Sequence, residues 1–164
     1  MLSIYAPHVQ GSSVSFEWEL PSLAEFGQRV NDVLQDFPWL VAEDESGILG
    51  YAYATKYRSR MAYQWSVETS VYVRGGLYRA GVGRKLYEEL IPVLKRQNLT
   101  TAYAVIALPN EKSVRFHEAM GFRYLCTYPK AGFKLGSWHD AGWWALELNP
   151  CEGIPQNPVP FGRL

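Results

Sequence analysis

The hydrophobic positions of the chain follow a helical pattern in two stretches. Across residues 22–37 apolar side chains recur every three or four positions, which predicts an amphipathic helix with Ser22 as its N-cap and Pro38 after its end. Residues 82–94 carry a second apolar stripe, and Pro92 inside it predicts a bend or an early end. Each helix is therefore expected to cover a core with one face.

Other stretches have the patterns of β-strands. Residues 39–57 predict a hairpin about a turn at Ser46 and Gly47, and residues 66–73 alternate between apolar and polar side chains. Residues 101–108 are rich in β-branched and aromatic residues and predict a buried strand. The remaining expectations are an irregular start, a short helix over 110–120, two strands within 122–148 and an extended tail over 149–164.

The order of these elements predicts the fold class. Strands and helices alternate in the middle of the chain and the last two strands follow each other, which indicates an α/β or α+β fold with helices on both faces of a sheet. A length of 164 residues is typical of one domain. We therefore expect residues 1–164 to form a single domain, with residues 149–164 as a Pro-rich C-terminal tail.

Composition and charge exclude several classes of function. Sixteen Lys and Arg balance sixteen Asp and Glu, so net charge gives no support to nucleic-acid binding. No apolar run approaches the roughly 20 residues of a membrane helix, and the start lacks the pattern of a signal peptide. Cys126 and Cys151 have neither metal nor redox spacing and are expected to be reduced. A cytoplasmic protein that binds no nucleic acid, membrane or metal is expected.

Residues 78–85, YRAGVGRK, place two glycines between a predicted strand and a predicted helix. A Rossmann fingerprint would need a third glycine at Leu86 and a P-loop would need a lysine at Val82, so both motifs fail. Glycines at a helix start let free N–H groups approach a phosphate, whose charge the helix dipole favours. The alternative interpretation is a tight turn beside solvated cations. The cations that could neutralise a diphosphate are Arg79, Arg84 and Lys85.

The succession of strand, glycine segment, helix, strand and the sequence NEKSVRFHEAMGF at 110–122 resembles the GNAT superfamily of N-acetyltransferases, which use acetyl-coenzyme A (acetyl-CoA). Within it the chain is similar to the phosphinothricin acetyltransferase family from about Ser13 to Leu148. The resemblance implies a mixed, mostly antiparallel sheet that lacks the family's first strand and most of its first helix. Tyr78 stands where the family loop has Gln or Arg. The segments that carry the resemblance are FPWLVAE (37–43), AYQWSVETSVYV (62–73), YAVIALPNEKSVRFHEAMGF (103–122) and AGFKLGSWHDAGWW (131–144).

The resemblance also implies acetyl-CoA as co-substrate and suggests the residues that bind it. The main-chain N–H groups of Gly81, Val82 and Gly83 would hold the diphosphate beside Arg79 and Arg84. Along the rest of the coenzyme, Val71, Tyr72 and Val73 would bind the pantetheine, and Asn110 and Ser113 would lie near its thiol.

Two residues are candidates for proton transfer. Acetyl transfer needs a neutral amine, and an α-ammonium group with a pKa of about 8 is mostly protonated at pH 7. Glu68 lies mid-strand, where glutamate is unfavourable unless it faces water or a site. The resemblance makes Glu68 the general base, against the alternative of an ordinary residue on a solvated sheet face. It also places His117 near the thioester, where it would move a proton that the sequence does not assign; the alternative is a structural histidine.

Acceptor binding is expected around residues 57–63. Arg58, Arg60 and Tyr63 lie close in sequence to Glu68, and a guanidinium can hold a carboxylate or phosphinate with two hydrogen bonds. The alternative is a basic surface loop. By resemblance, these residues meet the anionic groups of a glutamate-like acid, and Phe16 packs near it.

Two further residues match family positions at the rim of the site. These residues are Lys134 and Trp138. The alternative interpretations are that Lys134 is an ordinary solvated lysine and that Trp138 is an ordinary half-buried tryptophan. The family is usually dimeric, which exposed aromatic side chains in GWWALEL (142–148) would suit. A homodimer is therefore expected.

The sequence thus predicts an acetyl-CoA-dependent N-acetyltransferase whose acceptor is a small amino acid resembling phosphinothricin or methionine sulfoximine or sulfone. A GNAT enzyme that acetylates another amine, such as a polyamine or a peptide N-terminus, is the first alternative, although two arginines argue against a polycation. A degenerate acyl-CoA-binding module without activity is the second.

Overall fold

The computed structural model describes residues 1–77 and 80–164, and six strands within these ranges form one sheet. The strands are β1 (Trp39–Asp44), β2 (Gly47–Lys56), β3 (Ser66–Val73), β4 (Thr101–Leu108), β5 (Arg123–Lys134) and β6 (Ser137–Glu147). Their order is β1-β2-β3-β4-β6-β5, and only β3 and β4 run parallel to each other. The prediction of a mixed, mostly antiparallel sheet is confirmed.

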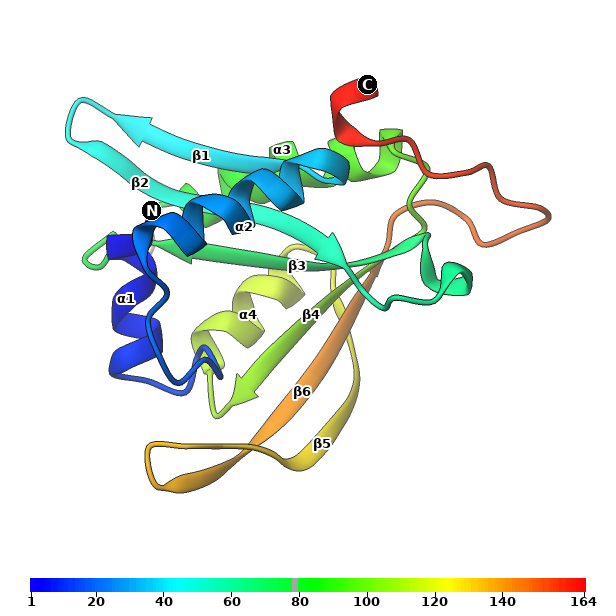
Figure 1. Cartoon of the computed structure of the whole chain (residues 1–164). Coiled ribbons are helices and arrows are strands. Elements are labelled where there is room, and N and C mark those ends of the chain that lie inside the picture. Colours follow the sequence, from blue (N-terminus) through cyan, green and yellow to red (C-terminus); the bar gives the residue numbers. More distant parts are fainter. Residues whose placement is uncertain (78–79) are drawn as a thin grey trace.

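Helices cover both faces of this sheet, as predicted (Figure 1). One face carries α1 (Leu2–Gln10) and α2 (Leu23–Asp36), and the other carries α3 (Val82–Arg96) and α4 (Glu111–Ala119). Two short 3-10 helices lie at Met61–Tyr63 (η1) and Phe161–Arg163 (η2).

Alternation along β2 divides the core between the two faces. Ala52 and Ala54 point to α3, and their small side chains allow the helix to bring Leu90 against the sheet. Tyr51 points to the other face, where its ring lies 6.2 Å from that of Phe26 on α2. The period-2 pattern of the sequence therefore fixes which face of the strand meets which helix.

The sheet is split between β3 and β4. Within the described residues these strands pair only from Ser66 to Glu68, opposite Thr101 to Tyr103. In contrast, β3 pairs with β2 from Val67 to Val73, and β4 pairs with β6 along its whole length. Figure 1 shows β3 and β4 diverging beyond their short contact, so that β1-β2-β3 and β4-β6-β5 form two halves of the sheet.

The first residues form helix α1, so the predicted irregular start is wrong. Ile4, Tyr5 and Val9 are buried against the α2 face of the sheet. Pro7 lies inside the helix and obscures its local pattern. Tertiary packing of one apolar face stabilises a helix that local preference alone would not predict.

Two element boundaries also differ from the prediction. Helix α3 does not end at Pro92 but continues to Arg96, because Leu90 and Leu94 on either side of the proline are fully buried. The β1–β2 turn lies at residues 45–46, one position earlier than predicted, since Asp44 pairs with the glycine at 47.

The tail over residues 149–164 is mostly irregular, and side chains of the domain hold it in place. The Trp65 indole N–H donates to the carbonyl of Gln156 at 2.7 Å, and Gln97 Nε2 donates to the carbonyl of Val159 at 2.8 Å. The tail ends in η2, which contacts α2.

Candidate active site

A cleft lies between the diverging parts of β3 and β4. Antiparallel pairing uses every second residue of a strand. Arg74, directly after β3, donates its main-chain N–H to the carbonyl of Leu49 on β2 at 2.7 Å. By alternation Tyr72 also bonds toward β2, whereas the main-chain groups of Val71 and Val73 point toward the cleft. Those groups have the extended geometry that could bind the amides of a pantetheine chain.

The cleft contains a cavity of about 60 Å³. Its walls come from both halves of the sheet, from α4 and from the segment between α1 and α2. The lining residues are Val14, Thr69, Ser70, Val71, Tyr72, Ala104, Val105, Ile106, Ala107, Asn110, Ser113 and His117.

Helix α3 begins with a left-handed glycine. Gly81 has a φ of 80°, a conformation that favours glycine, and a Cβ built on it would meet open space. Within the described residues no side chain caps this helix start. The first-turn N–H groups of Val82, Gly83 and Arg84 have no helix partners and could therefore hold an anion. Arg79, the other predicted diphosphate ligand, lies outside the described residues.

Gly83 makes room for the protein itself. A Cβ there would lie 3.3 Å from the Phe116 ring on α4 and 3.7 Å from Val71 Cγ2. Gly83 therefore lets α3 approach α4 and β3. Arg84 is exposed and forms a 3.7 Å ion pair with Glu88, and such a surface pair is too weak to prevent the guanidinium from turning toward a phosphate.

Helix α4 presents three of the predicted residues to the cleft. Asn110 caps the helix, since its Oδ1 accepts the main-chain N–H of Ser113 at 3.2 Å. His117 follows one turn later, and its Nδ1 lies 2.8 Å from the Ser113 carbonyl. Because a carbonyl only accepts, Nδ1 carries the proton and Nε2 is the acceptor. All three residues line the cavity.

Tyr87 on α3 is a candidate functional residue that the sequence analysis missed. Its hydroxyl lies 3.2 Å from His117 Nε2 and donates to it. Burial raises the pKa of Tyr87, so that its phenol stays protonated, and burial lowers the pKa of His117, so that its imidazole is neutral. The sequence does place a tyrosine beside Leu86 in a helix with an apolar face. A tyrosine buried there needs a hydrogen-bond partner for its hydroxyl, and this requirement could have pointed to Tyr87.

Glu68 lies on the opposite face of the sheet from His117. Its neighbour Thr69 is buried toward α3, so Glu68 points to the α1 face, directly opposite Tyr103 of β4. Burial raises the pKa of the Glu68 carboxyl, and the nearby positive charge of Arg58 partly offsets this effect. A raised pKa suits a group that must accept a proton near neutral pH.

A cluster of aromatic rings, called the aromatic floor below, lies beside this carboxyl group and consists of Tyr57, Tyr63, Tyr103 and Trp143. The Tyr57 ring lies 4.6 Å from Tyr103, 5.7 Å from Tyr63 and 6.0 Å from Trp143. The Arg58 guanidinium carbon lies 4.9 Å from the centre of the Tyr57 ring. The structure therefore brings the predicted residues Arg58 and Tyr63 together with the candidate base.

Arg60 is exposed at the start of η1, where its carbonyl accepts the main-chain N–H of Tyr63 at 3.0 Å. Among the described residues, the cation–π contact with Tyr57 is made by Arg58 and not by Arg60.

The segment between α1 and α2 covers part of this face. Phe16 lies against Gly132 of β5. Lys134 is buried, with 4% of its surface exposed, and its Nζ donates to the Ser15 carbonyl at 2.6 Å, so the solvated alternative is wrong. Trp138 is exposed (61%), so the half-buried alternative is also wrong.

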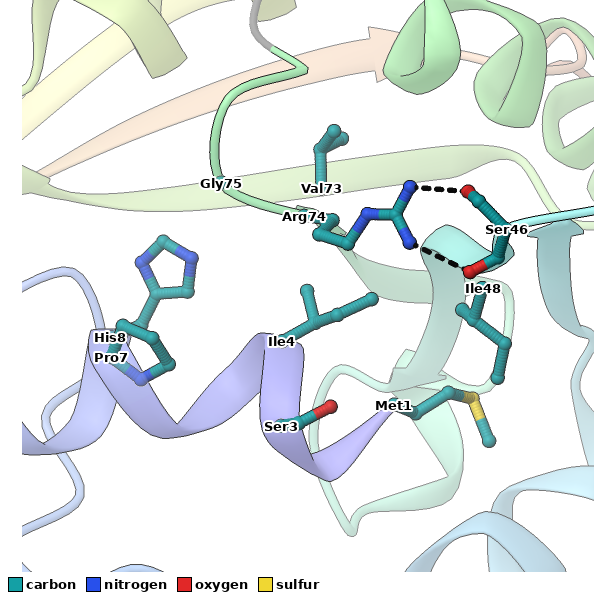
Figure 2. Close-up of a pocket in the computed structure, with 10 residues that line it drawn as sticks. All are labelled: Met1, Ser3, Ile4, Pro7, His8, Ser46, Ile48, Val73, Arg74 and Gly75. Carbon is teal, nitrogen blue, oxygen red and sulfur yellow. Dashed lines mark hydrogen bonds between the residues drawn. The ribbon is translucent and has the colours of Figure 1, made fainter. Parts of the chain in front are cut away.

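A hollow of about 520 Å³ lies beside α1 at the far end of β3 (Figure 2). Arg74 points across it to the β1–β2 turn and donates to the carbonyl and hydroxyl oxygens of Ser46 at 3.2 and 2.7 Å. Neither Glu68 nor His117 is among the described residues that line the hollow. The candidate chemistry therefore belongs to the cleft, and Arg74 supports the segment that leads to α3.

Comparison with known proteins gives the family. The model of the acetyltransferase (GNAT) domain matches residues 2–143. Over 153 residues the chain is 39% identical to the phosphinothricin N-acetyltransferase of Streptomyces viridochromogenes, which covers 93% of this chain and 84% of that protein. The chain belongs to the phosphinothricin N-acetyltransferase family of GNAT enzymes.

This GNAT enzyme also resembles other members of the superfamily. It is 34% identical over 116 residues to the L-methionine sulfoximine/L-methionine sulfone acetyltransferase of Salmonella typhimurium, covering 71% of this chain and 68% of that protein. A phosphinothricin acetyltransferase from Sinorhizobium meliloti, solved in complex with acetyl-CoA, superposes with a TM-score of 0.89 at 31% identity, covering 94% of this chain and 85% of that one. The predicted family, fold class, enzyme class and co-substrate are confirmed.

The remaining expectations concern membrane spans, metal sites, the cysteines and an exposed aromatic surface. Within residues 1–77 and 80–164, no helix combines the length and apolar character needed to span a membrane, and no group of three His, Cys, Asp or Glu could hold a metal ion. Cys126 and Cys151 are free in the structure. The sequence predicted exposed aromatic side chains within residues 142–148. For Trp144 this expectation is wrong, because Trp144 is buried beneath α4.

Proposed function

We propose that this GNAT enzyme acetylates the α-amino group of a small amino acid that carries a second, tetrahedral polar group. The observation that carries the proposal is the gathering of Arg58, Tyr63 and Glu68 on one face of the sheet, where β3 and β4 part. Phosphinothricin and methionine sulfoximine or sulfone, named for the relatives, have this chemistry.

The coenzyme is proposed to enter from the α3 side of the split. Main-chain groups of Val71 and Val73 would bind its pantetheine, and the N–H groups of residues 81–84 would bind its diphosphate with help from Arg79 and Arg84. Asn110 and Ser113 would flank the thiol end. The free strand edge and the uncapped helix start support this arrangement.

Glu68 is proposed as the general base. Acetyl-CoA supplies an activated acetyl group, whose carbonyl carbon forms a bond to the amine nitrogen as its bond to sulfur breaks. Glu68 takes a proton from the amine, directly or through a water, so that the nitrogen lone pair can attack. Its half-buried position and raised pKa support this role.

His117 is proposed to act on the leaving thiolate. It lies on the coenzyme side of the split, across the sheet from Glu68, and lines the cavity. Its Nε2 accepts from the Tyr87 hydroxyl, and both groups are neutral, because burial raises the pKa of the phenol and lowers that of the imidazole. The thiolate would therefore take its proton from solvent, with His117 passing it on.

Arg58 and Arg60 are proposed to bind the acidic groups of the acceptor, with Tyr63 and Phe16 beside it. The cation of Arg58 over Tyr57 favours an anion and opposes a polyamine. An amine without acidic groups, such as a peptide N-terminus, is the alternative acceptor.

The proposal is tested by thiol release from acetyl-CoA over a panel of amines. Phosphinothricin, methionine sulfone, spermidine and a short peptide would be compared at equal concentration with the purified protein. Release with phosphinothricin and methionine sulfone and little with spermidine or the peptide is expected. Faster release with either of the other two would contradict the proposed acceptor while leaving the enzyme class intact.

We also propose a single-domain, cytoplasmic homodimer. The edge strand β5 exposes Tyr124, Leu125 and Tyr128, an apolar surface that a second copy could cover. Light scattering after size-exclusion chromatography should give twice the mass of the chain. The mass of one chain would contradict the dimer.

A further inference from the structure

We propose that Lys134 is a positioning residue for the acceptor site, because its buried ammonium group fixes the segment Ser12–Glu17 across the open end of the cleft. The inference rests on the proposed acceptor face and deepens it. Lys134 lies at the end of β5, in the half of the sheet that does not carry Glu68.

The Lys134 side chain is buried and bonds to main-chain oxygens. Its Nζ donates to the carbonyl of Ser15 at 2.6 Å and lies 3.5 Å from that of His8. No ion pair to Lys134 is present within residues 1–77 and 80–164. Burying an ammonium group costs free energy unless its N–H groups are hydrogen-bonded. Moving either carbonyl away would break such a bond, so Lys134 holds the two carbonyls in place.

The segment that Lys134 holds is also attached to the other half of the sheet. The Tyr5 hydroxyl lies 2.7 Å from the Ser15 hydroxyl, and the Tyr5 ring lies 5.0 Å from Tyr72 on β3. Val14, in the middle of the segment, lines the cleft cavity. Ser12–Glu17 therefore spans the split, anchored to β3 through α1 and to β5 through Lys134.

The hairpin of β5 and β6 is shaped to receive this segment. A Cβ added to Gly132 would lie 2.6 Å from a Phe16 ring atom, so only glycine permits this contact. The Phe16 ring also lies 6.4 Å from that of His139 on β6. Lys134 and Gly132, two residues apart, thus fix the main chain at Ser15 and the ring at Phe16.

Loss of either contact should loosen the wall of the acceptor site and spare the coenzyme site. The acceptor would bind less well, because its wall would have to be ordered on binding. Of residues 12–17, only Val14 lines the cavity beside Val71, Asn110 and Ser113. The groups proposed for the coenzyme are main-chain atoms of β3 and the first turn of α3, which this hairpin does not form. A purely structural role would lower stability without separating acceptor binding from coenzyme binding.

The test compares Lys134→Met and Gly132→Ala with Lys130→Met, which removes an exposed lysine from the same strand. Amide hydrogen exchange at residues 12–17 needs no catalysis and should accelerate in the first two variants only. In steady-state kinetics, the acceptor KM should rise about tenfold in both, with kcat changed less than about threefold. The Kd of acetyl-CoA should match that of the wild type.

Wild-type exchange at residues 12–17 in Lys134→Met would overturn the anchoring role, whether or not the protein acetylates any amine. Faster exchange with an unchanged acceptor KM would overturn the link to the acceptor site. If Lys134→Met does not fold, the same two outcomes are decided by Lys134→Gln, which removes the charge and shortens the side chain but keeps a hydrogen-bond donor. A wild-type protein inactive on every amine would contradict the proposed function, and the exchange measurement would still decide the anchoring.

Discussion

Glu68 on β3 faces Tyr103 on β4 at the last paired position before the two strands diverge. The proposed base therefore stands where the sheet opens, with an aromatic floor on its own face and His117 on the other. This relationship would let the coenzyme and the acceptor, bound as proposed, reach one point from opposite sides. It also makes the proposed roles of individual residues separable by mutation.

Replacement of Glu68 tests the proposed base. Glu68→Gln keeps the shape of the side chain but cannot accept a proton, so kcat should fall by about 10²- to 10⁴-fold. The Kd of acetyl-CoA, measured by calorimetry, should stay unchanged. Glu43→Gln, which alters an exposed carboxylate on β1, is the matched control. A loss of only about threefold in Glu68→Gln would remove this residue from the chemistry.

The raised pKa of Glu68 predicts how activity and stability depend on pH. Activity should be lost as the pH falls through this raised pKa, which lies above the ordinary glutamate value of about 4.3. Because the folded state favours the protonated carboxyl, this group's contribution to stability decreases as the pH rises from the unfolded to the folded pKa. Glu68→Gln should therefore melt no lower than the wild type at pH 7. A lower melting temperature would show that the ionised carboxylate stabilises the fold.

Arg58 should influence the acceptor and the base together. Its positive charge lowers the Glu68 pKa, so Arg58→Ala should move the acid limb of the kcat profile to higher pH. The acceptor KM should also rise, more for phosphinothricin than for an acceptor without an acidic side chain. Because Arg58 is exposed, both effects should weaken with added salt. An equal change for both acceptors would place the guanidinium outside the site. Arg60→Ala should raise the acceptor KM less, because the cation–π contact with Tyr57 is made by Arg58.

The hydrogen bond between Tyr87 and His117 should matter for stability and for turnover. Tyr87→Phe leaves His117 Nε2 buried without a donor, so the free energy of unfolding should fall by roughly 1–3 kcal/mol in urea titration. A fall in kcat without a change in the acetyl-CoA Kd is expected as well. Tyr124→Phe removes an exposed hydroxyl and serves as the control. Loss of stability with full kcat would restrict Tyr87 to a structural role.

The left-handed conformation at Gly81 should be required for coenzyme binding. Gly81→Ala places a Cβ at a φ of 80°, which costs about 1–2 kcal/mol and should shift the first turn of α3. Acetyl-CoA should bind more weakly in calorimetry. Gly27→Ala on α2, where a Cβ meets open space and φ is not positive, should bind it normally and be no less stable. Equal affinity in the two variants would exclude the helix start as the diphosphate site.

The sequence predicted the parts of the fold that local periodicity determines. The alternation of residues 66–73 and the stripe on α3 placed Glu68 and Val71 on a strand and the glycines at a helix start. It did not predict α1, because Pro7 masks the pattern and burial of Tyr5 by distant residues stabilises the helix. Long-range packing of this kind leaves no local signal.

In the candidate site, too, local spacing predicted some features and long-range contacts determined the others. Spacing alone gathered Asn110, Ser113 and His117 on one helix face. The contacts of Tyr87 and Lys134 join residues 30 and 119 positions apart, so only the folded chain reveals them. The split between β3 and β4 likewise depends on which strands pair, and no segment encodes it alone.

A crystal structure of the protein with acetyl-CoA tests the central claim most directly. The account predicts the pantetheine along the open edge of β3, within hydrogen-bonding distance of the main chain of Val71 and Val73, and the diphosphate at the first turn of α3. Acetyl-CoA bound elsewhere, for example in the hollow between α1 and the β1–β2 turn, would contradict it.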